Sequence, residues 1–367
     1  MLLRVEFGLQ RFSYVFGTFL AKNLNYVYES GRQSVMEMLN LIFIKFPQNI
    51  LMEYTEMYFL ALVMSLVNDE SSKCREMSGA LIKSLLLRMD GERIKIVYSL
   101  LDKWFVTTEK KSLQRTAAQV YGLIVEAYGE KFKPRVVDLA GQLESLMKTS
   151  LEIMKDADIM EVDDDNMALD VDWEIGYYAL KTYSKVLKVF PETAYAQYSV
   201  GLWILIEEHL LYPHAWIRLS AARLLGVYFS GLNPETIIIG GMQNNFLTRD
   251  TLKKIAMRTA VQLKSVYLNE ELGTQIIKNL FFVGKCFFYM KPEEDLNETD
   301  QNGSLGLSED FSEIDQKNYL GQSKSTEPLS WLFMRLSHQL KSTKMTSPVH
   351  ALHVSFLFRF LMVRSVS

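Results

Sequence analysis

The sequence predicts an all-α protein, an α-solenoid of antiparallel helix pairs with two acidic loop insertions. Apolar residues recur with a helical period almost throughout the 367 residues, and helix breakers separate the periodic stretches. Gly and Pro are scarce, at 19 and 8 residues, which argues against an all-β protein built on many tight turns. The hydrophobic share of 49% is enough to bury a large core.

The expected helices follow one another with short connections, and Pro47, Gly91 and Pro134 mark three of the breaks. A short stretch at 235–241 is the best strand candidate, but it is isolated. The expected helices are 13–27, 31–46, 49–67, 71–89, 92–106, 109–128, 135–155, 173–189, 193–211, 214–230, 249–267, 271–289, 328–341 and 348–363.

Three stretches share one pattern: an apolar residue, a basic residue one or two places later, and two small residues at the fifth and sixth positions. They begin at Cys74, Leu113 and Ile217. The small pairs are Ser78-Gly79, Ala117-Ala118 and Ala221-Ala222. The first two starts are separated by about the length of one HEAT-type helical unit, so we predict HEAT-like repeats. Chance similarity among amphipathic helices is the alternative.

The third stretch shows why such repeats stack. Four of its residues recur at helical spacing and should form one buried stripe, which a lone helix pair cannot cover on both sides. Arg218 and Arg223 are expected to face water or to cap a neighbouring turn. Trp216 either packs inside the array or meets a partner. The four stripe residues are Ile217, Ala221, Leu224 and Tyr228.

The predicted organisation has five segments. HEAT-like helical repeats occupy 1–155 and 173–290, separated by an acidic insertion at 156–172. A disordered acidic linker at 291–327 precedes an incomplete terminal helix pair at 328–367. The simplest interpretation of the two acidic segments is that they are unselected loops. An acidic arm that docks on a basic partner is the alternative.

Residues typical of catalysis or metal binding are sparse. The sequence has no H-E-x-x-H, G-x-S-x-G, phosphate-loop or G-x-G-x-x-G motif. Cys74 and Cys286 alone cannot form a disulfide framework or a zinc site. His209 and His214 flank the turn at Pro213, where we expect turn or surface positions. We therefore expect no enzyme activity, cofactor, metal or small-molecule substrate.

The overall charge and hydropathy do not favour binding to nucleic acid or insertion into a membrane. The formal net charge is −3, so no strong overall field favours nucleic acid or an anionic membrane. The apolar stretch 58–67 is about half the length that spans a bilayer and is expected to be a buried helix face. Residues 1–20 carry charges and make a poor signal peptide. We expect no membrane association.

Basic residues nevertheless form local clusters, which are the candidate contacts with RNA or a partner. In a solenoid such clusters can align into a stripe that follows a phosphate backbone. Solvated helix faces are the more ordinary explanation. The candidate residues are Lys110, Lys111 and Arg115; Lys131, Lys133 and Arg135; and Lys253, Lys254 and Arg258.

Residues 23–47 and 57–79 resemble the C-terminal part of the very large HEAT-repeat protein of the small-subunit processome, the "down-regulated in metastasis" family. The tract 68–77, NDESSKCREM, is the most specific part of this resemblance. Residues 211–226 also fit, and the resemblance runs in order over roughly 20–290.

The resemblance implies a nucleolar, non-catalytic scaffold that supports pre-ribosomal RNA processing and assembly of the small ribosomal subunit. Its implied partners are processome proteins and the small nucleolar ribonucleoprotein, with pre-ribosomal RNA as a further candidate. Family members are several times longer and end in a Lys/Arg-rich tail that this chain lacks, so we expect a fragment or a truncated product. A HEAT-type transport or cargo-adaptor protein of the karyopherin kind is the alternative function.

Overall fold

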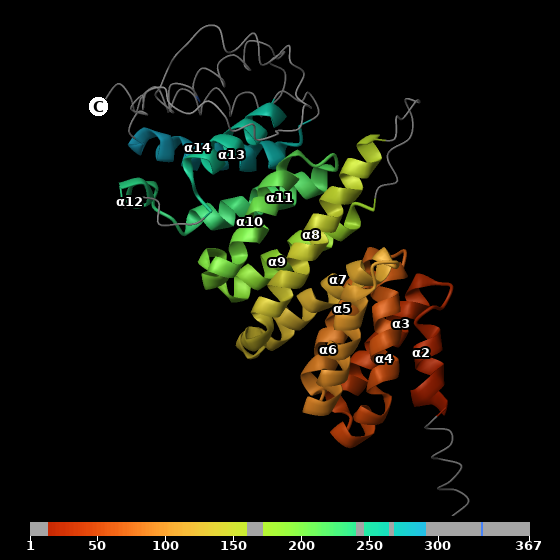
Figure 1. The fold of residues 1–367 in the computed structure, drawn as a ribbon. Coiled ribbons are helices and arrows are strands. Elements are labelled where there is room, and N and C mark those ends of the chain that lie inside the picture. Colours follow the sequence, from red (N-terminus) through yellow and green to blue (C-terminus); the bar gives the residue numbers. More distant parts are fainter. Residues whose placement is uncertain (1–13, 160–171, 240–245, 264–267, 291–331, 333–367) are drawn as a thin grey trace, which may run out of the picture. The chain divides into compact units, whose positions relative to one another are not determined.

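The structure is a computed structural model that describes residues 14–159, 172–239, 246–263 and 268–290, together with Leu332 (Figure 1). Within these residues every regular element is a helix, which confirms the all-α prediction. The chain forms two compact units, Met1–Ser220 and Ala221–Ser367. The linker expected at 291–327, most of the insertion expected at 156–172 and nearly all of the expected terminal pair lie outside the described residues.

Unit 1 holds most of the helices, and their bounds agree closely with those expected from the sequence. In chain order they are η1 (Val15–Phe19), α2 (Leu20–Asn23), α3 (Glu29–Lys45), α4 (Gln48–Asn68), α5 (Ser72–Arg88), α6 (Gly91–Val106), α7 (Lys111–Tyr128), η2 (Gly129–Arg135), α8 (Val136–Ile159), α9 (Glu174–Val189), η3 (Pro191–Tyr195), η4 (Gln197–Ser199), α10 (Val200–Glu208) and η5 (His209–Leu211). Helix α11 (Ala215–Ser230) crosses the boundary, and α12 (Pro234–Ile239), α13 (Arg249–Gln262) and α14 (Glu270–Tyr289) follow in unit 2.

The helices of unit 1 pack in two layers. Helices α3, α5, α7 and α9 each contact the next of the series, and α4 contacts α6 as α8 contacts α10. The pairs α4–α5, α6–α7 and α8–α9 join the layers, and the helices from α3 to α7 run side by side in Figure 1. Stacked helix pairs of an α-solenoid produce this contact pattern. The HEAT type of the repeats stays a prediction.

The small residue pairs lie at close helix contacts. Ala117 and Ala118 are fully buried, and the Thr182 hydroxyl of α9 donates to the Ala118 carbonyl at 2.7 Å. In unit 2 the Asn279 amide of α14 donates to the Ala222 carbonyl at 2.8 Å. A side chain reaches a neighbouring helix backbone in this way only where the residues between them are small. The stretches that begin at Leu113 and Ile217 thus make the same kind of contact at the same position. This supports the repeat inferred from the sequence.

The stripe predicted on α11 is confirmed by burial. Each of its four residues, Ile217, Ala221, Leu224 and Tyr228, is at most 2% exposed. These positions recur every three or four residues, so they share one face of the helix.

Two expected elements were wrong in detail. The helix expected at 193–211 is divided into η3, η4, α10 and η5, because Ala196 adopts an extended conformation. The Trp203 indole donates to the Ala194 carbonyl at 2.7 Å and so satisfies a group that a continuous helix would have used. The strand candidate at 235–241 overlaps helix α12, which begins at Pro234, a residue favoured in a first helical turn.

Helix α4 is the one described helix that is long and apolar enough to cross a membrane by length and composition. Half of the residues in its most apolar 18-residue stretch are buried, and Leu51, Tyr58 and Leu62 are fully enclosed. Helix α4 packs extensively on α5, as a core helix of the array does. The expected lack of membrane association stays a prediction.

Candidate interaction surfaces

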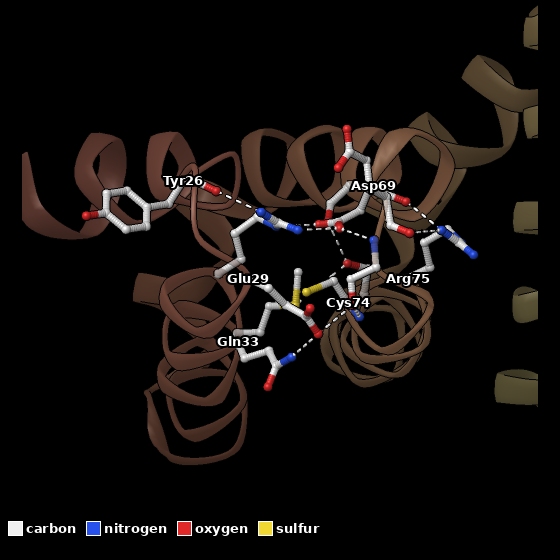
Figure 2. Close-up of polar contacts among 12 residues, drawn as sticks. Tyr26, Glu29, Gln33, Asp69, Cys74 and Arg75 are labelled. Carbon is white, nitrogen blue, oxygen red and sulfur yellow. Dashed lines mark hydrogen bonds and ion pairs between the residues drawn. The ribbon is translucent and has the colours of Figure 1, made fainter.

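The tract that carries the family resemblance forms the turn between α4 and α5, shown in Figure 2. Asp69 ends α4, and its carboxylate receives two hydrogen bonds from Arg32 of α3, both at 2.8 Å. The side chains are 3% and 13% exposed. The Ser71 amide also donates to Asp69, at 2.9 Å. A bidentate, largely buried ion pair fixes the orientation of both side chains.

Ser71 begins the next helix from the same turn. Its hydroxyl accepts the Cys74 amide at 3.3 Å, which is a helix N-cap, and donates to Glu29 at 2.7 Å. Gln33 donates to the same Glu29 carboxylate at 2.6 Å (Figure 2). The polar groups of the turn are therefore engaged with one another, and the tract is a structural joint between repeats.

An arginine closes the turn before its own helix in three repeats. Arg75 donates to the carbonyls of Asp69 and Glu70 at 2.6 and 2.9 Å (Figure 2). Arg218 donates in the same way to Tyr212, at 2.8 Å, and to Pro213. This confirms the capping expected for Arg218.

The third such arginine, Arg32, was missed from the sequence. It donates to the carbonyls of Tyr26 and Val27 at 2.9 and 3.1 Å, again six and five residues before itself. The spacing between Arg32 and Arg75 was the available signal, since it is close to one repeat.

The first candidate basic cluster lies at the start of α7. Lys110 and Lys111 are exposed. Arg115 forms an ion pair with Glu174 in the first turn of α9. In the stretch that begins at Leu113 the basic residue, Arg115, stands one position later than Arg75 does in the stretch that begins at Cys74. Arg115 joins two helices, whereas Arg75 caps a turn.

The second candidate cluster lies in η2, beyond the other end of α7. Helix α7 has 18 residues and is about 27 Å long, so the first two clusters are far apart. Lys131 is exposed, and Lys133 pairs with Glu192 at 3.3 Å on the surface. Arg135 pairs with Asp102 at 2.8 Å.

The third candidate cluster belongs to unit 2. Lys253, Lys254 and Arg258 are on α13, where Lys254 is exposed and the other two are half-buried. The structure therefore does not assemble the three clusters into one stripe within either unit.

The structure instead brings Arg135 to an open groove along α6, which we call the α6 groove. Its volume is about 850 Å³. The Arg135 guanidinium lies 4.2 Å above the centre of the Tyr98 ring. Sequence reasoning missed the α6 members of this site, although their spacing of three and four residues places them on one helix face. The lining residues are Lys95, Tyr98, Ser99, Asp102, Lys103, Val106, Thr107 and Arg135.

Asp102 anchors the wall of the α6 groove. It accepts hydrogen bonds from the Tyr121 hydroxyl at 2.5 Å, from Arg135 at 2.8 Å and from Gln142 at 3.1 Å. Burial alone would raise the pKa of Asp102, but these three donors outweigh it and the pKa lies below its usual value. The carboxylate is thus a fixed negative charge that holds Arg135 in place.

Of the two positions expected for His209, the turn is correct, because His209 is the first residue of η5, and the surface position is wrong. Its ring is fully buried, and Nδ1 donates to the Leu205 carbonyl at 2.7 Å. Burial lowers the pKa of His209 to about 4, so the ring is neutral at pH 7. The 3-10 turn η5 follows α10 directly and continues its helical winding past His209. The ring therefore points inward, and it stacks on Tyr212.

His214 and Trp216 form a partly exposed aromatic cluster at the start of α11. The His214 ring stacks on Trp173 with centroids 3.8 Å apart. Trp216 contacts Trp173 edge to face at 5.5 Å and remains 58% exposed. Within the described residues, Trp216 therefore lies at the surface of the array.

Reactive groups for metal or covalent chemistry are few. Among the described residues no group of three His, Cys, Asp or Glu side chains could hold a metal ion. Cys74 and Cys286 are both buried, and burial raises the pKa of the Cys286 thiol to about 12. The expected lack of a metal, a cofactor and an enzyme activity stays a prediction.

Comparison with known proteins identifies two relatives. The chain is 32% identical over 282 residues to U3 small nucleolar RNA-associated protein 20 of Schizosaccharomyces pombe, a match that covers 76% of this chain and 11% of that protein. It is 30% identical over 262 residues to the Saccharomyces cerevisiae protein of the same name, covering 71% and 10%. No family model matches the chain. The chain thus spans about a tenth of the length of these relatives, and the resemblance stated from residues 23–47 and 57–79 is confirmed.

Proposed function

We propose, from the premise that this chain is a relative of part of U3 small nucleolar RNA-associated protein 20, that it acts as a non-catalytic scaffold of the small-subunit processome. In this role it supports pre-ribosomal RNA processing and assembly of the small ribosomal subunit in the nucleolus. Its partners are processome proteins and the U3 small nucleolar ribonucleoprotein. The observation that carries the proposal is the similarity over three quarters of the chain to two proteins named for their association with that RNA.

The mechanism is geometric. The two helical layers of unit 1 make a continuous surface whose turns are held by arginine–carbonyl contacts. The Arg32–Asp69 pair ties the turn before α3 to the turn before α5, so adjacent repeats keep a fixed spacing. Such an array presents side chains from several repeats at constant distances, which suits the assembly of several partners at once.

Several contacts support a role without catalysis. His209 is enclosed and neutral, and Asp102 is engaged by Tyr121, Arg135 and Gln142. The Asp69 carboxylate is enclosed by Arg32 and the Ser71 amide. Each of these three groups has a partner that accounts for its position structurally, which supports a role other than proton transfer.

Affinity purification followed by RNA sequencing tests the proposal. The protein carrying this sequence should be tagged in cells and purified from nuclear extract. Enrichment of U3 small nucleolar RNA and small-subunit precursors over large-subunit precursors is expected. Depletion of the protein should lower mature small-subunit ribosomal RNA, and normal levels after depletion would overturn the proposal.

The same preparation tests the transport-adaptor alternative. The purified chain should be incubated with small GTPases and with a Lys/Arg-rich cargo peptide. The scaffold proposal expects no nucleotide-dependent binding of a GTPase. A GTPase that binds the chain and releases the cargo would favour the karyopherin-like function.

A further inference from the structure

We infer that the α6 groove is a binding site for single-stranded RNA, which it holds by the phosphate backbone. This inference rests on the proposed function and adds to it a direct RNA contact at named residues. The groove combines three cations, Lys95, Lys103 and Arg135, with an aromatic wall at Tyr98. Proteins that bind single strands without strong sequence preference use grooves of this composition.

The charge of the α6 groove favours an anionic chain. Lys95, Lys103 and Arg135 face one lining carboxylate, Asp102. Because Asp102 is engaged by Arg135, the two lysines supply the net positive charge. Phosphates are attracted by such a surface, and counterion release adds to the binding free energy.

Both lysines are free to change partners. Lys103 is exposed, and the Lys95 side chain is 74% exposed although it lies 3.2 Å from Glu92. Glu92 is itself 82% exposed, so water and salt screen the pair and it is worth little. A phosphate group can replace Glu92 at Lys95 without uncovering a buried charge.

Arg135 adds a preformed element to the α6 groove. Asp102 and the Tyr98 ring hold its guanidinium from two sides. An arginine that is already ordered loses less side-chain entropy when it binds a phosphate. The Ser99 side chain at the groove lining supplies a hydroxyl group that can donate to a phosphate oxygen, whereas the Thr107 hydroxyl already donates to the Lys103 carbonyl at 2.8 Å.

Basic residues continue beyond the groove on η2. Lys131 is exposed four residues before Arg135, and Lys133 makes a surface pair with Glu192. Of the second cluster, Arg135 lines the α6 groove, and Lys131 and Lys133 precede it by four and two residues on η2. A linear polyanion can follow this series of charges, whereas a single small anion would use one of them.

Binding of a labelled single-stranded RNA of mixed sequence to the full chain, followed by fluorescence anisotropy, tests the inference. The paired substitution Lys95→Glu and Lys103→Glu should weaken binding by about tenfold or more at physiological salt. It should also reduce the slope of log K against log salt by roughly 1.4, which corresponds to two lost phosphate contacts. The pair Lys95→Arg and Lys103→Arg should keep the affinity.

A matched control lies at the other end of α7. The pair Lys110→Glu and Lys111→Glu makes the same change of charge at exposed positions outside the groove. It should change the affinity by about twofold or less. All four lysines are exposed, so the helical circular dichroism of both double variants should match that of the unchanged chain.

Three outcomes would overturn the inference. They are unchanged RNA affinity in the groove variant, equal loss in the groove and control variants, and displacement of RNA by poly-glutamate at equal charge concentration. The last would identify an acidic peptide as the ligand. U3 small nucleolar RNA that copurifies with the groove variant from cells would leave the scaffold proposal standing in each case, so the two can fail separately.

Discussion

Two ion pairs of unit 1 show how differently the same chemistry is used in the α4–α5 turn and in the α6 groove. Arg32 and Asp69 meet through two hydrogen bonds of 2.8 Å, with side chains 13% and 3% exposed. Lys95 and Glu92 meet at 3.2 Å, with side chains 74% and 82% exposed. The charged groups of the first pair are shielded from water, so they bind each other and hold adjacent repeats together. The second exchanges freely with solvent and leaves Lys95 available to a ligand.

The largest effect is expected when the buried pair is broken. Arg32→Ala should lower the free energy of unfolding by more than the loss of a surface ion pair does, because it leaves the enclosed Asp69 carboxylate without its cation. The Tyr26 and Val27 carbonyls also lose a donor. Urea denaturation of the full chain measures the change. A loss below about 1 kcal/mol would show that Asp69 is solvated, as a surface pair would be.

Acid should lower the free energy of unfolding because it favours protonation of His209, which is buried in its neutral form. The folded state lowers the pKa of this histidine from 6.5 to about 4, so between these values the unfolded chain binds more protons. The free energy of unfolding therefore falls as the pH drops below about 6.5, by about 2 kcal/mol between pH 7 and pH 5. Urea denaturation at both pH values measures it.

Two variants assign the acid effect. In His209→Gln the extra loss at pH 5 should disappear. In His214→Gln, which changes the half-buried ring that stacks on Trp173, most of the loss should remain. Equal pH dependence in the unchanged chain and in His209→Gln would mean that His209 is not enclosed.

Overpacking of a small pair should cost a comparable amount or less. Ala118→Leu places a branched side chain where the Thr182 hydroxyl approaches the α7 backbone, and we expect a loss of about 1–3 kcal/mol. Thermal denaturation measures the change. Lys111→Leu on the exposed start of the same helix is the matched control. An unchanged melting temperature in Ala118→Leu would contradict the close contact between α7 and α9.

The smallest change in stability is expected in the groove. Lys95→Ala should alter the free energy of unfolding by less than about 0.5 kcal/mol, because its ion pair with Glu92 is solvated. The same variant should weaken RNA binding measurably. A stability loss near that of Arg32→Ala would remove the distinction between the two ion pairs.

Much of the fold could be predicted from local signals. Pro47 immediately precedes α4 and Gly91 is the first residue of α6, so the breakers marked these boundaries. The small pairs predicted the close contacts at Ala118 and Ala222, because only small residues permit them. The division of the expected helix 193–211 could not be predicted, since it depends on the Trp203 indole reaching the Ala194 carbonyl.

The candidate site was harder to predict. The cluster at Lys131, Lys133 and Arg135 was recognised as a run of basic residues. The groove that Arg135 lines is formed with residues of α6, which lies earlier in the chain, so it could not be recognised from the cluster alone. Lys95 and Lys103 are separated by two helical turns and look like ordinary solvated positions. The burial of His209 was missed because its nearness to Pro213 suggested an exposed turn, whereas η5 continues the helical winding of α10 and the ring is buried.

The arginines that close the turns have a consequence for how the chain reaches its native state. Each of them donates to carbonyls five and six residues earlier in the chain, and each repeat then contacts its immediate neighbours. Such short-range contacts correspond to a low contact order, which favours fast folding. Repeats held in this way can fold one after another as the chain leaves the ribosome, before the rest of it has been made.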